Sequence, residues 1–163
     1  MTSYRTFSVA VAILLFARLS PGADLATKKA LTLEVAKQMA AAAEAAASQN
    51  KWTVVIAIVD DGGNLIYLER MDETQIGSVQ VATEKAQTAV RFKRPSKALE
   101  DAVAGGRTAI LKLPGALPVE GGLPVAVDGK IIGAIGVSGM SSQQDGQIAK
   151  AAIDALPKIL GGR

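Results

Sequence analysis

Residues 117–139 read LPVEGGLPVAVDGKIIGAIGVSG and predict a β-hairpin. Two apolar strands, residues 123–127 and 130–137, flank Asp128-Gly129, a dipeptide typical of tight hairpin turns. Three glycines follow at intervals of three residues: Gly133, Gly136 and Gly139. Glycine weakens a strand, so this spacing indicates close approach of another backbone or of a ligand. The hairpin is therefore the first candidate for a binding surface.

The pattern outside this hairpin predicts a second antiparallel strand pair and several helices. Residues 52–59 and 65–70 are predicted strands, joined by a turn at residues 60–64. Predicted helices cover residues 32–48 and 78–90, a third begins at the capping residue Ser96, and a last one follows a capping box at residues 142–145. Because tight turns join both strand pairs and no βαβ alternation is present, we expect an α+β domain. Helices would pack against its antiparallel sheet.

The N-terminal segment has the pattern of a secretory signal peptide. A basic Arg5 precedes the apolar run of residues 7–17, and small residues follow at 20–23. We expect a signal peptide over residues 1–22, cleaved after Gly22 or Ala23, and one domain over residues 23–163. The product would be periplasmic or secreted. An uncleaved membrane anchor is the alternative, although the run is short for a bilayer.

Composition excludes several classes of function. The 163 residues include no cysteine and no histidine, which rules out thiolate catalysis, His-based triads and imidazole ligands to a metal. Signal cleavage would remove Arg5 and Arg18, so Lys+Arg falls from 18 to 16 against 15 acids, a net charge of +1. Neither nucleic-acid binding nor membrane-surface binding of the mature chain has electrostatic support.

Five positions between residues 84 and 96 are candidate ligand-binding groups. Lys85 borders the apolar face of its predicted helix, whereas Glu84 points away from that face; both positions also fit ordinary helix-surface residues. Arg91 and Arg94 belong to a basic cluster before Pro95-Ser96. The cluster could clamp carboxylates together with Ser96, or simply compensate the negative end of a helix.

Glu120-Gly121-Gly122 directly precedes the hairpin. The two glycines permit positive φ angles and close backbone approach, which fits either a binding loop or a plain turn. The turn explains the glycines but not the acid before them. All three residues are therefore candidate ligand contacts.

Several of these stretches together resemble the GlcG/HbpS family. The stretches that carry the resemblance are Ile58-Val59-Asp60, Glu69-Arg70-Met71-Asp72, Lys85-Ala86, Arg94-Pro95-Ser96, Gly121-Gly122-Leu123-Pro124, residues 128–139 and Gln144-Asp145. They span nearly the whole predicted mature chain. The hairpin is the most specific of them.

The resemblance implies a profilin-like α+β fold, homo-oligomers and, for secreted members, haem binding linked in some cases to haem degradation or iron handling. Family members also occur with corrinoid enzymes and in glycolate-utilisation operons, which makes corrinoid the weaker cofactor alternative. By the same resemblance Ser96 falls near the haem site, and Glu84 falls on a helix that carries acids near iron. The absence of histidine departs from members thought to use it.

The sequence thus supports an exported, oligomeric haem-binding protein, with Lys85, Arg91 or Arg94 pairing with the propionates. The second hypothesis is an enzyme or binding protein for a small carboxylate such as an α-hydroxy acid, with Glu120, Asp145 or Lys85 as acid or base. The third is an assembly partner that binds no small molecule. Whether any reaction is catalysed stays open at this point.

Overall fold

The computed structural model describes residues 22–161 of the chain. The predicted signal peptide, residues 1–22, lies outside these residues except for Gly22. The helices in the described part are α1 (Leu33–Gln49), α2 (Ser78–Arg91), α3 (Lys97–Ala104), the short 3₁₀ helix η1 (Thr108–Lys112) and α4 (Ser142–Gly161). The strands are β1 (Val55–Asp60), β2 (Leu65–Arg70), β3 (Gly122–Val127) and β4 (Lys130–Ser138).

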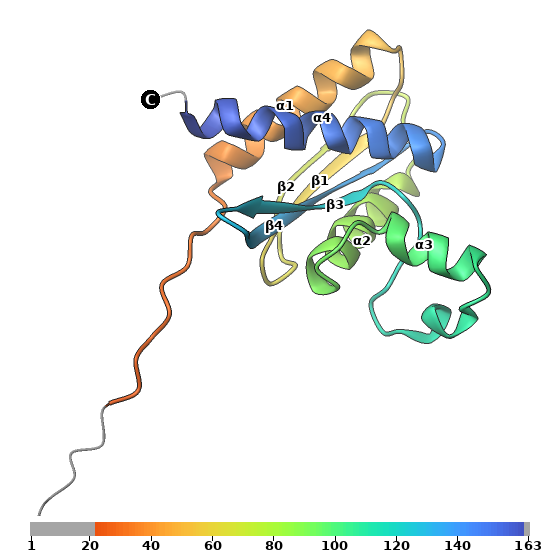
Figure 1. Ribbon diagram of the computed structural model, residues 1–163. Helices are drawn as coiled ribbons and strands as arrows, with labels where there is room; N and C mark the ends of the chain where they lie inside the picture. The colour runs from red at the N-terminus through yellow and green to blue at the C-terminus, as the bar shows by residue number, and fades with distance from the viewer. Residues whose placement is uncertain (1–21, 162–163) are drawn as a thin grey trace, which may run out of the picture.

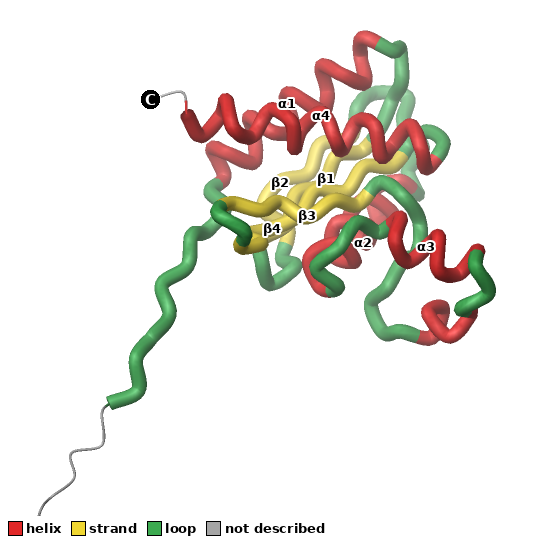
Figure 2. Tube along the Cα trace, in the orientation of Figure 1, coloured by secondary structure: helices red, strands yellow, loops and turns green. Residues whose placement is uncertain are grey.

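The four strands form one antiparallel sheet in the order β2-β1-β4-β3 (Figure 2). The hairpins β1–β2 and β3–β4 join along β1 and β4, where Ile58 lies opposite Ile135. Both predicted hairpins and the α+β class are therefore confirmed. Strand β2 matches its predicted range, and β1 begins at Val55 rather than at Trp52.

Helices cover both faces of the sheet. Figure 1 shows α1 and α4 on one face, and α2 with α3 on the other. Alternate residues of β1 supply the two cores: Ile56 and Ile58 pack with α1 and α4, whereas Val55, Ala57 and Val59 pack with α2. This double burial explains why β1 reads as an unbroken apolar run, since a strand covered on one face alternates apolar and polar residues.

The backbone of α2 lies unusually close to β3 and β4. A Cβ at Gly136 would lie 2.0 Å from the Ala82 carbonyl oxygen, and one at Gly122 would lie 2.1 Å from the Lys85 carbonyl oxygen. Contacts this short leave no room for any side chain. At these two positions the predicted close approach of another backbone is confirmed.

Two of the predicted helix caps differ in the structure. The box before α4 is Ser141 with Gln144, because the Gln144 side chain accepts from the Ser141 N–H at 3.1 Å and Gln144 N–H donates back to Ser141 Oγ at 3.4 Å. The predicted box at residues 142–145 was one residue too late. Ser96 precedes α3, but its hydroxyl makes no capping bond to that helix. It bonds to the segment before β3 instead.

The segment before α1 is extended and crosses the tips of both hairpins. Lys28 pairs with Asp61 in the β1–β2 turn, and Lys29 pairs with Asp128 in the β3–β4 turn at 2.6 Å. Thr32 caps α1, as predicted, by accepting from the Val35 N–H at 3.3 Å. No helix within residues 22–161 is long and apolar enough to span a bilayer.

Candidate functional site

A pocket of about 410 Å³ opens where β3 begins. Its floor is the backbone of Gly121 and Gly122, and Leu123, Pro95 and Ile153 supply apolar walls. The pocket lies between the start of β3, the start of α3 and one side of α4, three segments that are distant in sequence. We call it the β3 pocket.

Glu120 supplies a carboxylate to the β3 pocket. Its side chain lies across Gly146, where an added Cβ would be 2.7 Å from Glu120 Oε1. The Glu120 N–H donates to Glu100 Oε2 at 2.6 Å, which fixes the backbone from which the side chain extends. None of the described residues donates a hydrogen bond to the Glu120 carboxylate. It is therefore available to a ligand.

Two lysines stand at the rim of the same pocket. Lys97 pairs with Asp101 at 2.6 Å and Lys150 pairs with Asp154 at 2.5 Å, each across one helical turn. All four side chains are at least half exposed, and exposed ion pairs contribute little to stability. Either lysine can therefore exchange its present partner for a ligand carboxylate at small cost. The neighbouring Asp101 carboxylate raises the pKa of Lys97, so this ammonium stays charged.

A buried ion pair lies beneath the floor. Lys85 Nζ is 2.8 Å from Asp145 Oδ2 and 3.0 Å from the Val137 carbonyl oxygen, and both side chains are 2% exposed. Asp145 Oδ1 also accepts from the Met140 N–H at 3.0 Å. Burial raises the pKa of Asp145, an effect that the Lys85 ammonium and the backbone N–H groups partly offset. Lys85 does not reach the pocket surface.

Ser96 is likewise buried behind the floor. Its Oγ donates to the Val119 carbonyl at 2.6 Å and accepts from the Gly122 N–H at 2.9 Å. Its own N–H donates to the Gly122 carbonyl oxygen at 2.9 Å. These bonds hold residues 119–122 against the start of α3. In this structure Ser96 therefore shapes the pocket without facing it.

The remaining predicted residues lie elsewhere. Arg91 and Glu84 line a second pocket of about 320 Å³ on α2, where the guanidinium lies between Gly63 and Gly115. Arg94 is exposed and donates from Nε to the Phe92 carbonyl at 3.0 Å. The basic cluster is thus spread over different surfaces. The structure unites Glu120, Gly121 and Gly122 at one pocket, with Lys85 and Ser96 behind it.

Sequence reasoning missed several contributors to the β3 pocket, among them Pro95, Lys97, Gly146 and Lys150. The available signal for Gly146 was its position inside an otherwise alanine-rich helix. Glycine lowers helix stability there, so its presence indicates that a neighbouring group packs closely against it. The two lysines look like ordinary surface residues in sequence. They gain meaning only through the position of α3 and α4 around the hairpin.

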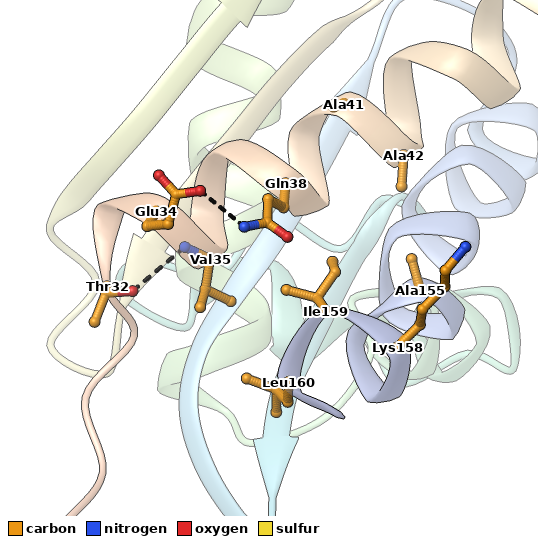
Figure 3. Close-up of a pocket in the computed structure, with 10 residues that line it drawn as sticks. All are labelled: Thr32, Glu34, Val35, Gln38, Ala41, Ala42, Ala155, Lys158, Ile159 and Leu160. Carbon is orange, nitrogen blue, oxygen red and sulfur yellow. Dashed lines mark hydrogen bonds between the residues drawn. The ribbon is translucent and has the colours of Figure 1, made fainter. Parts of the chain in front are cut away.

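A larger groove of about 630 Å³ lies between α1 and α4 (Figure 3). Small side chains line its floor, among them Ala41, Ala42 and Ala155, and Figure 3 shows Glu34 hydrogen-bonded to Gln38 at its edge. None of the residues predicted for ligand binding lines this groove. We therefore place the candidate site at the β3 pocket, which Glu120, Gly121 and Gly122 line.

The sequence profile of a family described as haem degrading protein HbpS-like matches residues 31–154. The chain belongs to this family. The resemblance to GlcG/HbpS proteins drawn from the motifs is thereby confirmed. Within the family the chain is 45% identical over 112 residues to Protein GlcG of Escherichia coli K12, covering 69% of this chain and 84% of GlcG.

Solved relatives of this HbpS-like chain share its fold. A double mutant of HbpS from Streptomyces reticuli superposes with a TM-score of 0.76 at 34% identity, covering 93% of this chain and 99% of HbpS. A structure described as a PduOC–haem complex gives a TM-score of 0.71 at 34% identity, covering 78% and 95% of the two chains.

The corrinoid adenosyltransferase PduO of Salmonella typhimurium LT2 is 35% identical to the HbpS-like chain over 141 residues. That match covers 83% of this chain but only 42% of PduO. The chain therefore corresponds to one part of that larger enzyme.

Proposed function

We propose that this protein binds haem in the β3 pocket. The observation that carries the proposal is a floor of bare backbone, Gly121-Gly122, with apolar walls, two rim ammonium groups and one unpaired carboxylate. Membership of the HbpS-like family and the haem complex of the PduO domain support it. The pocket volume also lies within the usual range for small-molecule sites, roughly 300–1,000 Å³.

The residues present fit the chemistry of haem. Leu123 and Ile153 offer apolar contact to a flat macrocycle, while Lys97 and Lys150 offer cations to its propionates. Since the chain has no histidine or cysteine, an iron ligand from this pocket would be a carboxylate oxygen or a lysine amine, and Glu120 is its free carboxylate. Haem, when bound, supplies an iron centre whose redox properties depend on such ligands and on burial. The chain's own part is to hold and orient the group.

Hemin titration of the purified apoprotein tests this proposal. We expect a saturable change in the Soret band. Glu120→Gln should lower hemin affinity about tenfold, because the substitution keeps the shape of the side chain and removes its negatively charged carboxylate. Arg94→Gln is the matched control, since Arg94 lies outside the pocket and its loss should leave affinity unchanged. Absence of saturable binding to the unsubstituted protein would refute haem binding.

We further propose export, with residues 1–22 removed, and a role in haem degradation or iron handling in the periplasm or outside the cell. The N-terminal pattern supports export, and the description of the family supports the haem-related role. N-terminal sequencing of protein recovered from a bacterial host tests the export step. We expect a first residue of Ala23 or Asp24; a cytoplasmic product that retains Met1 would contradict it.

A second candidate function is binding of a small carboxylate at Arg91. The observation that favours it is that the Arg91 guanidinium forms no ion pair with any residue in the range 22–161, although it lines a pocket. A thermal-shift screen with small α-hydroxy acids separates the two functions. Stabilisation by such acids that Arg91→Gln removes, with none by hemin, would favour this candidate over haem.

A further inference from the structure

The floor of the β3 pocket rests directly on the buried Lys85–Asp145 pair. A Cβ at Gly121 would lie 2.9 Å from Lys85 Nζ, 3.1 Å from Asp145 Cβ and 2.7 Å from the Val137 carbonyl oxygen. The Gly121 backbone therefore lies between the ammonium and the pocket. Gly121 has φ +126°, a conformation that other residues rarely adopt, so glycine is doubly required here.

The same pair is connected to Glu120 through α4. Asp145 and Gly146 are neighbours in the first turns of this helix, roughly 100° apart around its axis. Asp145 points inward to Lys85, and this orientation turns Gly146 towards Glu120, whose Oε1 would be 2.7 Å from an added Cβ. Rotating α4 to release Asp145 would therefore move the surface on which the Glu120 side chain lies.

Stability alone does not account for this arrangement. Taking two charges out of water costs about as much as their attraction returns, and well-packed apolar residues often replace a buried ion pair without loss. Lys85 and Asp145 are nevertheless the site where α2, the end of β4 and the first turn of α4 meet. A directional contact of this kind fixes mutual position, which apolar packing specifies less strictly.

We propose that the Lys85–Asp145 pair is a positioning unit for the β3 pocket, holding residues 120–122 and α4 so that the Glu120 carboxylate faces the bound group. The inference rests on the proposed haem function for its ligand. It assigns Lys85 a role from beneath the floor in place of the direct propionate contact predicted from sequence. Ligand affinity should then depend on the pair more strongly than folding does.

The double variant Lys85→Met/Asp145→Asn tests this inference, because it removes both charges while nearly preserving side-chain volume. We expect hemin affinity to fall at least tenfold with a shifted Soret band, while the protein remains folded. Met39→Ala is the matched control: Met39 is fully buried on α1 and does not line the pocket, and its truncation destabilises the fold. If affinity follows thermal stability equally in both variants, the pair is merely structural and the inference is overturned.

Hydrogen exchange of the apoprotein gives a reading that needs no haem. Two amides report on the pocket floor: the Gly122 N–H donates to Ser96, and the Val137 N–H donates to the Gly121 carbonyl. Both should exchange about tenfold faster in the double variant, while the amides of β1 and β2 keep their exchange rates. Unchanged exchange at both amides overturns the inference. If the unsubstituted protein does not bind hemin, the proposed haem-binding function is refuted. The hydrogen-exchange rates of the apoprotein then decide by themselves whether the ion pair positions the pocket floor.

A measurement on the unsubstituted protein covers the case in which the double variant does not fold. Hemin should slow exchange of the Met140 N–H, which donates to Asp145 Oδ1 and does not line the pocket. Such protection would show that the ion pair responds to occupancy. Saturating hemin without any effect at Met140 would overturn the inference.

Discussion

Gly122 lies where the start of β3 crosses α2. An added Cβ would be 2.1 Å from the Lys85 carbonyl oxygen, which is a backbone atom that cannot move aside without shifting the helix. The substitution Gly122→Ala should therefore destabilise the protein by about 1–3 kcal/mol, the usual cost of overpacking. Urea unfolding followed by circular dichroism measures this loss.

Gly77→Ala is the matched control for that variant. Gly77 precedes α2, has no heavy atom within 4 Å of a built Cβ and has a φ of −58° that alanine adopts freely. We expect no loss there, and a gain of up to about 1 kcal/mol from the reduced entropy of the unfolded chain. Equal destabilisation by both substitutions would contradict the close approach of α2 to β3.

Asp60 makes the β1–β2 turn sensitive to acid. Its Oδ1 accepts from the Gly62 and Asn64 N–H groups, both at 2.8 Å, and the bonds with Asn64 hold the pKa of Asp60 below its ordinary value of 3.8. A lowered folded-state pKa gives stability that is present above the unfolded pKa and is lost as pH falls through the folded one. Asp60→Ala should accordingly lower Tm at about pH 7 and lower it less at about pH 2. Thermal melts at the two pH values check this, and an equal loss at both would contradict it.

At the scale of elements, one buried hydroxyl contributes two of the hydrogen bonds that attach the start of α3 to the segment entering β3. Ser96 Oγ bonds to the Val119 carbonyl and the Gly122 N–H, so Ser96→Ala leaves both groups without their partner. We expect a loss of about 1–3 kcal/mol and a weaker hemin affinity, since the pocket floor loosens. Thermal unfolding and hemin titration measure the two effects. Ser48→Ala is the control on the exposed end of α1, and a comparable loss there would argue against the role of Ser96.

The elements themselves follow from sequence to a large extent. The turn at residues 60–64 that returns the chain as strand 65–70, the Asp128-Gly129 turn and the Thr32 cap specify local geometry, and each was predicted correctly. Predictions failed where a side chain has a tertiary partner. Ser96 looks like a helix cap in sequence, but the Gly122 N–H competes for its hydroxyl. Asp145 looks like part of a capping box, but its carboxylate forms an ion pair with Lys85, which is 60 residues away in sequence.

The candidate site was predictable only in part, for the same reason. Glu120-Gly121-Gly122 are contiguous and carry a local signal, so sequence analysis found them. Lys97 and Lys150 come from different helices, and nothing local marks them as neighbours of the hairpin. Arg91 and Arg94 are close in sequence yet lie on different surfaces, because α2 ends at Arg91 and the chain turns at Lys93, whose φ is +52°.

At the scale of the whole molecule, the rim charges should govern how ionic strength affects ligand binding. Replacing Lys97 and Lys150 together with alanine removes the two cations that face bound carboxylates. Hemin affinity should fall up to about tenfold, and its salt dependence should weaken, since exposed charges are screened at physiological ionic strength. Titrations at low and high salt measure both effects.

Lys37→Ala with Lys112→Ala is the control for that pair, because it changes the net charge equally on exposed residues outside the β3 pocket. These substitutions should leave hemin affinity and its salt dependence close to those of the unsubstituted protein. A matching drop in the control would show that net charge, rather than the pocket rim, attracts the ligand.

The extended segment that crosses the two hairpin tips determines where the N-terminal part of the chain leaves the body of the protein. Strand β3 runs from the pocket at Gly122 to the turn at Asp128, where Lys29 is attached, so the segment leaves the body about 17 Å or more from the ligand. Figure 1 places the end of α4 on that side as well. A fusion partner, an affinity tag or an immobilising surface joined at either terminus would thus leave the mouth of the pocket open.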